Sequence, residues 1–378
     1  MVKKLIRYLR SLRFPYTPLV EITISKEKLL HNLHTFQQIN PEVKITPVLK
    51  SNAYGHGLNL IAQIIDKENI SFIAVDSYHE ALIFRNENIK SKILILDYTP
   101  INNIILNKLS KISFTLTSFE QIQEIAKTIT KPNYFHIKID TGMHRQGILS
   151  AQIKEVCELI NTNKNIIIEG VCSHLADADG ETPEFTKIQI DEWNKIVKQV
   201  TQQFPNIKYR HISATSGALY INEIDANVMR LGIGLYGIDP NNKLGLKPIL
   251  EMKSIISGTK IIEKGQKIGY NGTFEAKEKM RIATIPAGYY EGIDRRLSNK
   301  GFVKIENTFC PIVGNVSMNI TSIDITNVPQ AKFKTPVIII SSNPKDKNSF
   351  ENIAKINNTI PYDIMAHIPW QLRRKVTT

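Results

Sequence analysis

Residues 44–57 read KITPVLKSNAYGHG, and this stretch decides the fold. The first half is β-branched and apolar without a helical period, which predicts a short buried strand ending at Lys50. The Ser, Asn, Gly and His residues that follow are typical of a turn. A lysine partly removed from water at a strand end can bind a carbonyl cofactor covalently, although such a lysine more commonly only covers apolar surface. Tyr54 supplies a hydroxyl that can reach a phosphate.

The composition is that of an ordinary globular protein. The chain has 378 residues, of which 42% are hydrophobic and 22% are charged. This length allows two domains, and no apolar run approaches the roughly 18–20 residues of a membrane span. The three cysteines, Cys157, Cys172 and Cys310, are far apart, which favours a reducing, cytoplasmic compartment over a disulfide framework.

The net charge of +13 raises the question of nucleic-acid binding. However, the lysines are scattered and often paired with glutamate, as in KEK at 26–28, so we expect no nucleic-acid partner. Basic residues also interrupt every apolar cluster near the N-terminus, which therefore lacks the core of a secretory signal. We interpret residues 1–16 as a solvated basic extension; an amphipathic helix lying on a partner or an anionic membrane is the alternative.

From Lys44 onward, strand and helix patterns alternate about eight times. This alternation predicts a (β/α)₈ barrel over residues 17–241. An open doubly wound sheet is the competitor, but no GxGxxG word opens the first helix. The expected strands are 44–50, 71–76, 92–98, 113–117, 134–140, 166–173, 209–213 and 227–233, and the clearest helices between them are 58–65, 118–130, 151–160 and 183–204.

The alternation stops near Gly237, and short alternating runs separated by Gly, Asn and Lys turns follow. We therefore predict that residues 242–378 form a mostly β domain. The expected strands are 249–256, 259–262, 281–286, 302–305, 320–324 and 336–340, followed by a helix at 350–356.

Short polar segments follow several of the expected barrel strands, and the functional residues of such barrels lie at these strand ends. HIKIDTGMHRQG (136–147) contains Lys138 and Arg145, and GVCSHLADAD (170–179) places His174 at a strand end. Arginine suits a carboxylate or phenolate in a shielded site. Each of these residues, taken alone, is also compatible with a structural role.

The last two barrel strands end in HISATSG (211–217) and RLGIGLYG (230–237). Phosphate sites commonly lie after strands seven and eight of a barrel, where hydroxyls and free backbone N–H groups converge. Four residues there are candidate phosphate ligands, and Arg230 would lie beside them. The four are Thr215, Ser216, Gly232 and Ile233.

In order and spacing, these words resemble the alanine racemase family over residues 20–374. The resemblance implies that Lys50 carries pyridoxal 5'-phosphate (PLP) and that Tyr54 contacts the cofactor phosphate. It implies that Arg145 binds the cofactor phenolate and substrate carboxylate, held by Lys138, which is sometimes carbamylated in the family. It also implies cofactor contacts for the remaining barrel residues, with Arg230 at the pyridine nitrogen; these residues are His174, Thr215, Ser216, Arg230, Gly232 and Ile233.

The second domain carries further family words. KGQKIGYNGTFEA (264–276) resembles the word that holds the catalytic tyrosine, here Tyr270. AGYYEGIDRR (287–296) resembles the entrance word with Tyr289, and VGNVSMN (313–319) the word whose methionine contacts substrate, here Met318. IPYDIMAHIPWQLRR (360–374) resembles the terminal word.

Three positions depart from the family pattern. Asn319 replaces the usual aspartate after the methionine, and His144 replaces the glycine before Arg145. Trp370 replaces a tyrosine that touches the phosphate; its indole N–H can donate, but the side chain is larger. These departures leave strict alanine specificity open.

The resemblance implies a cytoplasmic, PLP-dependent isomerase that interconverts L- and D-alanine with two bases, Lys50 and Tyr270, supplying D-alanine for peptidoglycan. It also implies a homodimer with shared active sites, with no metal. A racemase for serine or another amino acid is the closest alternative. A PLP decarboxylase is less compatible, because Cys310 is followed by Pro311 rather than by the expected acid.

Overall fold

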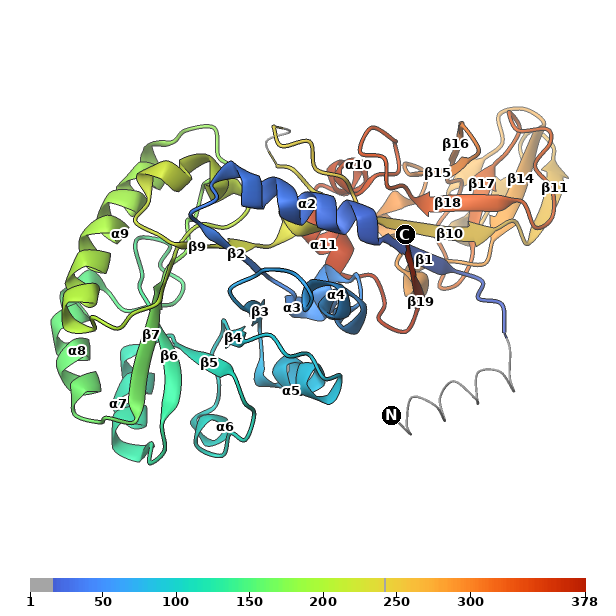
Figure 1. Cartoon of the computed structure of the whole chain (residues 1–378). Coiled ribbons are helices and arrows are strands. Elements are labelled where there is room, and N and C mark those ends of the chain that lie inside the picture. Colours follow the sequence, from blue (N-terminus) through green and yellow to red (C-terminus); the bar gives the residue numbers. More distant parts are fainter. Residues whose placement is uncertain (1–15, 241–242) are drawn as a thin grey trace. The chain divides into compact units, whose positions relative to one another are not determined.

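The computed structural model describes residues 16–240 and 243–378, which form two compact units (Figure 1). The barrel unit comprises residues 25–249 with 376–378, and the β unit comprises residues up to Ile24 with 250–375. Residues 17–24, which we predicted as barrel, therefore lie in the β unit, because β1 (Glu21–Ser25) pairs antiparallel with β10 (Leu250–Ile255). Residues 1–15 of the predicted extension lie outside the described residues.

The barrel unit contains a closed ring of parallel strands. Strands β3 to β8 form one sheet, and β2 pairs with β9. A bridge between Val48 and Ala74 joins β2 to β3, and the backbone N–H of Arg230 donates to Ser213 to join β9 to β8. The predicted barrel is confirmed. Its strands are β2 (Lys44–Pro47), β3 (Ile73–Val75), β4 (Ile93–Ile95), β5 (Ile112–Leu116), β6 (Asn133–Lys138), β7 (Ile166–Cys172), β8 (Tyr209–His211) and β9 (Val228–Leu231).

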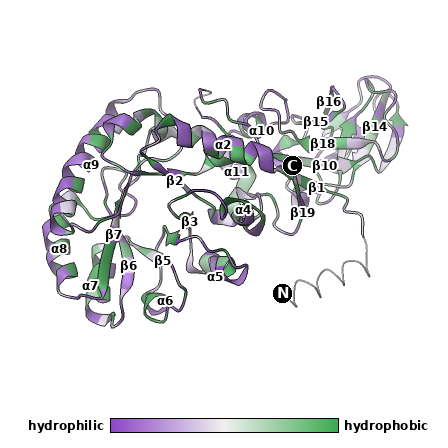
Figure 2. Cartoon of the chain, in the orientation of Figure 1, coloured by the Kyte–Doolittle hydropathy of each residue, from purple (hydrophilic) through white to green (hydrophobic). Residues whose placement is uncertain are grey.

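Amphipathic helices cover the outside of the strands. In α8, Ile153, Val156, Cys157 and Ile160 form one buried stripe, which is the helical spacing expected of a core-facing surface. Figure 2 shows purple and green alternating along α8 and α9. The helices are α2 (Lys26–Ile39), α4 (Leu58–Ile65), α5 (Tyr78–Asn86), α6 (Ile101–Ile105), α7 (Phe119–Thr128), α8 (Ile153–Asn161) and α9 (Glu184–Gln203), with short η1 (Ser150–Gln152), η2 (Ser216–Glu223) and η3 (Ile233–Tyr236).

The β unit contains a six-stranded sheet in the order β16-β15-β18-β10-β1-β19 and a three-stranded sheet in the order β11-β14-β17. Every strand predicted for this domain is present, but four strands of two to five residues and the six-residue helix α11 were missed, because such short elements carry little pattern. The remaining elements are β11 (Gly258–Ile262), β12 (Lys267–Ile268), η4 (Tyr270–Gly272), β13 (Phe274–Glu275), β14 (Met280–Ile285), η5 (Tyr289–Glu291), η6 (Arg295–Leu297), β15 (Phe302–Ile305), β16 (Thr308–Pro311), β17 (Thr321–Asp324), β18 (Pro336–Ile340), α10 (Phe350–Ile356), α11 (Pro361–Ala366) and β19 (Arg373–Thr377).

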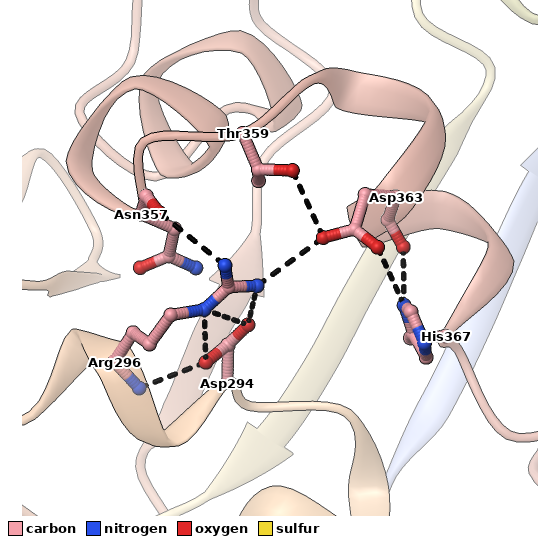
Figure 3. A network of polar contacts seen from close by, with 6 residues as sticks. All are labelled: Asp294, Arg296, Asn357, Thr359, Asp363 and His367. Carbon is pink, nitrogen blue, oxygen red and sulfur yellow. Dashed lines mark hydrogen bonds and ion pairs between the residues drawn. The ribbon is translucent and has the colours of Figure 1, made fainter.

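An ion-pair network fixes α11 within the β unit (Figure 3). The guanidinium of Arg296 lies 2.6 Å from Asp294 and 3.2 Å from Asp363, and it also donates to the carbonyl of Asn357. His367 at the end of α11 lies 3.1 Å from the Asp363 carboxylate. The network therefore joins η6 to α11, which lies within the terminal word. Among the described residues, no helix combines the length and apolarity that a membrane crossing requires.

Gly237 and Gly245 both have a positive φ, but only at Gly237 would an added Cβ also clash with neighbouring backbone. Gly237 has φ +89°, and an added Cβ would lie 2.0 Å from the Lys247 carbonyl oxygen, whereas Gly245 has φ +64° and open space around it. We predict that Gly245→Ala costs about 1–2 kcal/mol of unfolding free energy, the ordinary price of a left-handed alanine. Gly237→Ala should cost at least about 3 kcal/mol, because backbone must also move. Urea unfolding of both variants tests this, and equal losses would contradict it.

Candidate active site

Lys50 lies just beyond the carboxyl end of β2. The strand ends at Pro47, three residues earlier than predicted, and Lys50 opens the turn labelled α3 (Lys50–Tyr54). Its ammonium donates to Asp76 at 3.3 Å, and the Lys50 side chain is 40% exposed. Lys50 is therefore partly exposed beside a carboxylate, just past the end of the strand.

The turn after Lys50 is left-handed. Four consecutive non-glycine residues, 51–54, have φ between 51° and 56°, a conformation that costs roughly 1–2 kcal/mol each. Specific hydrogen bonds offset this strain: Ser51 N–H donates to Glu80 at 2.7 Å, and the Asn52 side chain accepts from Leu58 N–H at 2.9 Å. Sustained strain of this kind concentrates at functional sites.

The left-handed turn places Tyr54 beside the loop after β9. A Cβ added to Gly232 would lie 2.9 Å from the Tyr54 hydroxyl, so only glycine allows this approach. Nearby, Thr215 is buried and its hydroxyl accepts from Gly234 N–H at 3.1 Å. Ser216 and Ile233 begin η2 and η3, whose first N–H groups have no partner within their own helices. The predicted phosphate ligands thus lie on adjoining segments with Tyr54.

Arg230 is buried and held by five acceptors. Its guanidinium donates to the carbonyls of Ser173, His211 and Ile212 at 2.7–3.0 Å. It also donates to Nδ1 of His211 at 2.6 Å and to Nδ1 of His174 at 3.0 Å. Burial and the neighbouring cations lower the pKa of His174 to about 3, so this imidazole is neutral near pH 7. Arg230 is therefore rigidly oriented.

A pocket beside His174 is lined by Lys138, Met143 and Arg145. Lys138 donates to the Gln146 amide at 3.4 Å, and that amide donates in turn to Asp97 at 2.6 Å. Burial, supported by nearby Arg230 and Arg145, lowers the pKa of Lys138. Asp140 also lines the pocket, but Lys138 and Arg145 outnumber this carboxylate, so the lining is net basic.

His144 occupies a left-handed position with φ 53°. Asp140 accepts from the N–H groups of Gly142 and His144 at 2.9 and 3.0 Å, which holds the turn before Arg145. The His144 ring also lies 3.4 Å from the Asp140 carboxylate. This conformation explains why glycine suits the position, and the contacts with Asp140 offset its cost for histidine.

The other candidate residues lie in the β unit. Tyr270, Tyr289 and Met318 are 69%, 41% and 55% exposed. Tyr289 N–H donates to Ser317, and the Asn315 amide donates to the Tyr270 carbonyl, so adjoining loops carry all three. The structure thus places the candidates in two groups, one in each unit.

The two remaining departures from the family pattern also lie in the β unit. The Asn319 amide donates to Glu291 at 2.7 Å, and Glu291 also accepts from Gly288 N–H at 2.8 Å. The amide of Asn319 thus braces the loop that carries Tyr289. Trp370 is 80% exposed within this unit.

Sequence reasoning missed several residues that contact the predicted ones. Asp76 pairs with Lys50, Gln146 binds Lys138, and His211 binds Arg230. His211 ends β8 as His174 follows β7, so its strand-end position was a usable signal. Asp76 likewise follows β3 directly, so its strand-end position was also usable, whereas Gln146 lies in the turn after β6 and has no such signal.

The fold and site together describe a parallel barrel with a partly exposed lysine just beyond β2 and a pocket lined by Lys138 and Arg145. Residues 24–240 match the family model "Alanine racemase, N-terminal domain", and residues 249–376 match "Alanine racemase, C-terminal domain". The chain therefore belongs to the alanine racemase family.

Curated relatives match along nearly their whole length. The chain is 31% identical to "Alanine racemase 1" of Caldanaerobacter subterraneus, covering 93% of each chain. It is 32% identical to "Alanine racemase" of Helicobacter pylori, covering 93% of this chain and 97% of the relative. Alanine racemase structures from Clostridium difficile and from Bacillus anthracis with bound L-Ala-P superpose with TM-scores of 0.87 and 0.88, at 29% and 26% identity, each covering 96% of both chains.

The buried histidines make stability depend on pH. Burial lowers the pKa of His136, His174 and His211 below the ordinary value of about 6.5. The unfolded chain therefore binds protons that the folded chain does not, and stability is lost as pH falls below about 6.5. For His174, whose folded-state pKa of about 3 lies far below this range, we predict a loss of about 1.4 kcal/mol between about pH 7.5 and about pH 5.5; His136 and His211 add to the loss in the same direction.

Urea unfolding at the two pH values measures this loss. His174→Asn removes one of the three titrating groups and should reduce the loss by about 1.4 kcal/mol. An equal pH dependence in both proteins would show that His174 is not held neutral by the fold.

Proposed function

We propose that this protein is a PLP-dependent racemase that interconverts L- and D-alanine. The observation that carries the proposal is the left-handed turn after Lys50, which presents an accessible lysine and brings the Tyr54 hydroxyl to the Gly232 backbone. The chain's membership of the alanine racemase family supports the proposal. Supply of D-alanine for peptidoglycan, in the cytoplasm, is the proposed cellular role.

The barrel residues fit PLP. A doubly charged phosphate suits the hydroxyls and helix-start N–H groups around Gly232, where the absence of a Cβ leaves the backbone accessible beside Tyr54. Arg230 would contact the ring nitrogen, and Lys50 would hold the cofactor covalently. When bound, PLP withdraws electrons from the substrate Cα and so acidifies its proton.

Inversion at Cα requires a base on each face of the substrate. We assign Lys50 to one face and Tyr270 to the other, so that one side chain removes the proton and the other returns one. Arg145 would bind the substrate carboxylate, with Lys138 beside it in the basic pocket. Met318 and Tyr289 would line the substrate path.

Arg230 would favour racemisation over side reactions. The guanidinium gives up a proton with great difficulty, and five acceptors already bind it in a fixed orientation. The cofactor nitrogen would therefore stay unprotonated, which limits how far negative charge spreads from Cα. Return of a proton to Cα would then be favoured over other reactions.

The proposed assembly is a homodimer with shared sites. Lys50 belongs to the barrel unit and the exposed Tyr270 to the β unit, and the family pattern pairs the lysine of one subunit with the tyrosine of the other. Each subunit would thus contribute to both sites.

A racemase for serine or another amino acid is the second candidate. It is favoured by Trp370 in place of tyrosine and by Asn319, whose amide is committed to Glu291. A racemisation assay over a panel of amino acids decides between the two. A faster rate with serine than with alanine would establish the second candidate.

Replacing Lys50 tests the cofactor assignment. We predict that Lys50→Ala loses the visible absorbance of lysine-bound PLP and reduces alanine racemisation by at least about a thousandfold, because it removes both the attachment point and one base. Lys44→Ala, at the exposed start of the same strand, is the matched control and should keep both properties. Absorbance retained by dialysed Lys50→Ala protein would place the cofactor lysine elsewhere.

Mixing inactive subunits tests the shared site. In a Lys50→Ala and Tyr270→Phe heterodimer, one site lacks both bases and the other has both. After complete exchange at equal amounts, roughly half the dimers are mixed, so roughly a quarter of wild-type activity should return. The readout is the racemisation rate after subunit exchange, which mass spectrometry verifies. A verified exchange with no recovery would contradict the shared site.

A further inference from the structure

A chain of buried polar side chains runs through the barrel interior from Arg230. Nδ1 of His211 lies 2.6 Å from the guanidinium, and Nε2 of His211 lies 2.8 Å from Nδ1 of His136. Nε2 of His136, which has no hydrogen-bond partner among the described residues, then lies 3.6 Å from the carboxylate of Glu169, an electrostatic contact rather than a hydrogen bond. His136, His211 and Glu169 are all buried, and the reaction assigned above uses none of them.

The contact with Arg230 fixes which histidine nitrogens donate a proton and which accept one. A guanidinium has only donors, so Nδ1 of His211 must present a lone pair to it. Burial and the adjacent Arg230 lower the pKa of His211 well below its ordinary value, so the ring is neutral and carries its one proton on Nε2. That proton is donated to Nδ1 of His136.

The same reasoning extends to the carboxylate. Because Nδ1 of His136 accepts, the proton of this neutral imidazole lies on Nε2 and faces Glu169. Burial alone would raise the pKa of Glu169, but its contacts with His136, Lys92 and Ser113 together lower it to about 2. An ionised carboxylate can only accept, and it therefore closes the chain with an acceptor.

The residues around Glu169 and His136 shield these side chains from water and keep the carboxylate charged. Lys92 and Ser113 both donate to Glu169, and the Lys92 ammonium lies 5.3 Å from the ring centres of both Tyr134 and Tyr209. A Cβ on Gly170 would lie 2.4 Å from Nδ1 of His136, so the glycine lets the imidazole lie directly on the strand backbone. Packing thus fixes the ring.

We propose that Glu169 is a positioning residue for Arg230: its carboxylate is the terminal acceptor that keeps the protons of His136 and His211 on Nε2, so that Nδ1 of His211 always accepts from the guanidinium. Its effect on the cofactor, through the Arg230 contact with the ring nitrogen, rests on the proposed function. The proton order itself does not.

A neutral amide in place of the carboxylate would break this order. In Glu169→Gln, the amide oxygen turns to the Lys92 ammonium and the amide N–H₂ turns to His136. The chain then has a donor at each end, and two neutral imidazoles, each with one donor and one acceptor, cannot satisfy all three links. One donor must face another, and Arg230 loses its fixed partner when this mismatch falls at His211.

Nitrogen-15 NMR of histidine-labelled full-length protein, with and without PLP, measures the proton position directly. In the wild type, His136, His174 and His211 should all be neutral with the proton on Nε2. A proton on Nδ1, or a charged ring, at His136 or His211 near pH 7 would overturn the proposal without any variant.

Three variants separate charge from packing. Glu169→Gln should move the protons of both His136 and His211 to Nδ1, so that Arg230 loses its His211 acceptor, and weaken PLP binding about tenfold, the effect of losing one hydrogen bond to a charged group. Ser113→Ala removes one donor but keeps the carboxylate, and it should leave both measurements unchanged. His136→Phe cuts the same chain and should weaken PLP binding similarly, which provides the test if Glu169→Gln does not fold.

The outcomes also distinguish this proposal from the proposed function. Unchanged histidine tautomers and unchanged PLP affinity in Glu169→Gln would reduce Glu169 to a structural residue. A wild-type protein that binds no PLP would instead refute the proposed function, while the tautomer measurement would still decide the proton order.

Discussion

The pairing of β2 with β9 is the interaction on which the site depends. It closes the barrel and aligns Thr46 with Arg230 and Pro47 with Leu231. Lys50 follows β2 and Gly232 follows β9. Both residues therefore lie at the carboxyl end of this strand pair. A one-residue shift in this register would reverse the side of the sheet on which each side chain lies, so the buried core on both faces protects the register.

The site combines local strain with rigid support. The left-handed turn after Lys50 is unfavourable by itself, and it persists because Glu80 binds both the Ser51 and the Asp76 N–H groups. Glu80 thereby links the strained turn to the carboxylate partner of Lys50. Strain of this kind is retained where the surrounding structure leaves the backbone no alternative.

Electrostatics give the site its chemical character. Lys50, Lys138, Arg145 and Arg230 lie on the barrel unit, while the buried histidines beside them are held neutral. The arrangement attracts anions without providing histidine acids in the interior. Glu169, paired with Lys92, keeps its negative charge within the barrel and balances part of the buried positive charge.

Much of the fold was predictable from the sequence. Alternating strand and helix patterns depend on local periodicity, so the barrel strands and most of its helices were found in place. The membership of β1 was not predictable, because a short strand carries no record of which sheet it joins. Likewise, the two-residue strands of the β unit leave too little pattern to detect.

The sequence by itself determined the order of the elements and the residue types at the strand ends, since both are local properties of the chain. Only the tertiary structure decided that Lys50 is accessible beside Asp76 and that Arg230 connects through two histidines to Glu169. The physical reason is that these properties arise from contacts between residues 19 to 75 positions apart, which barrel closure brings together and no local pattern records.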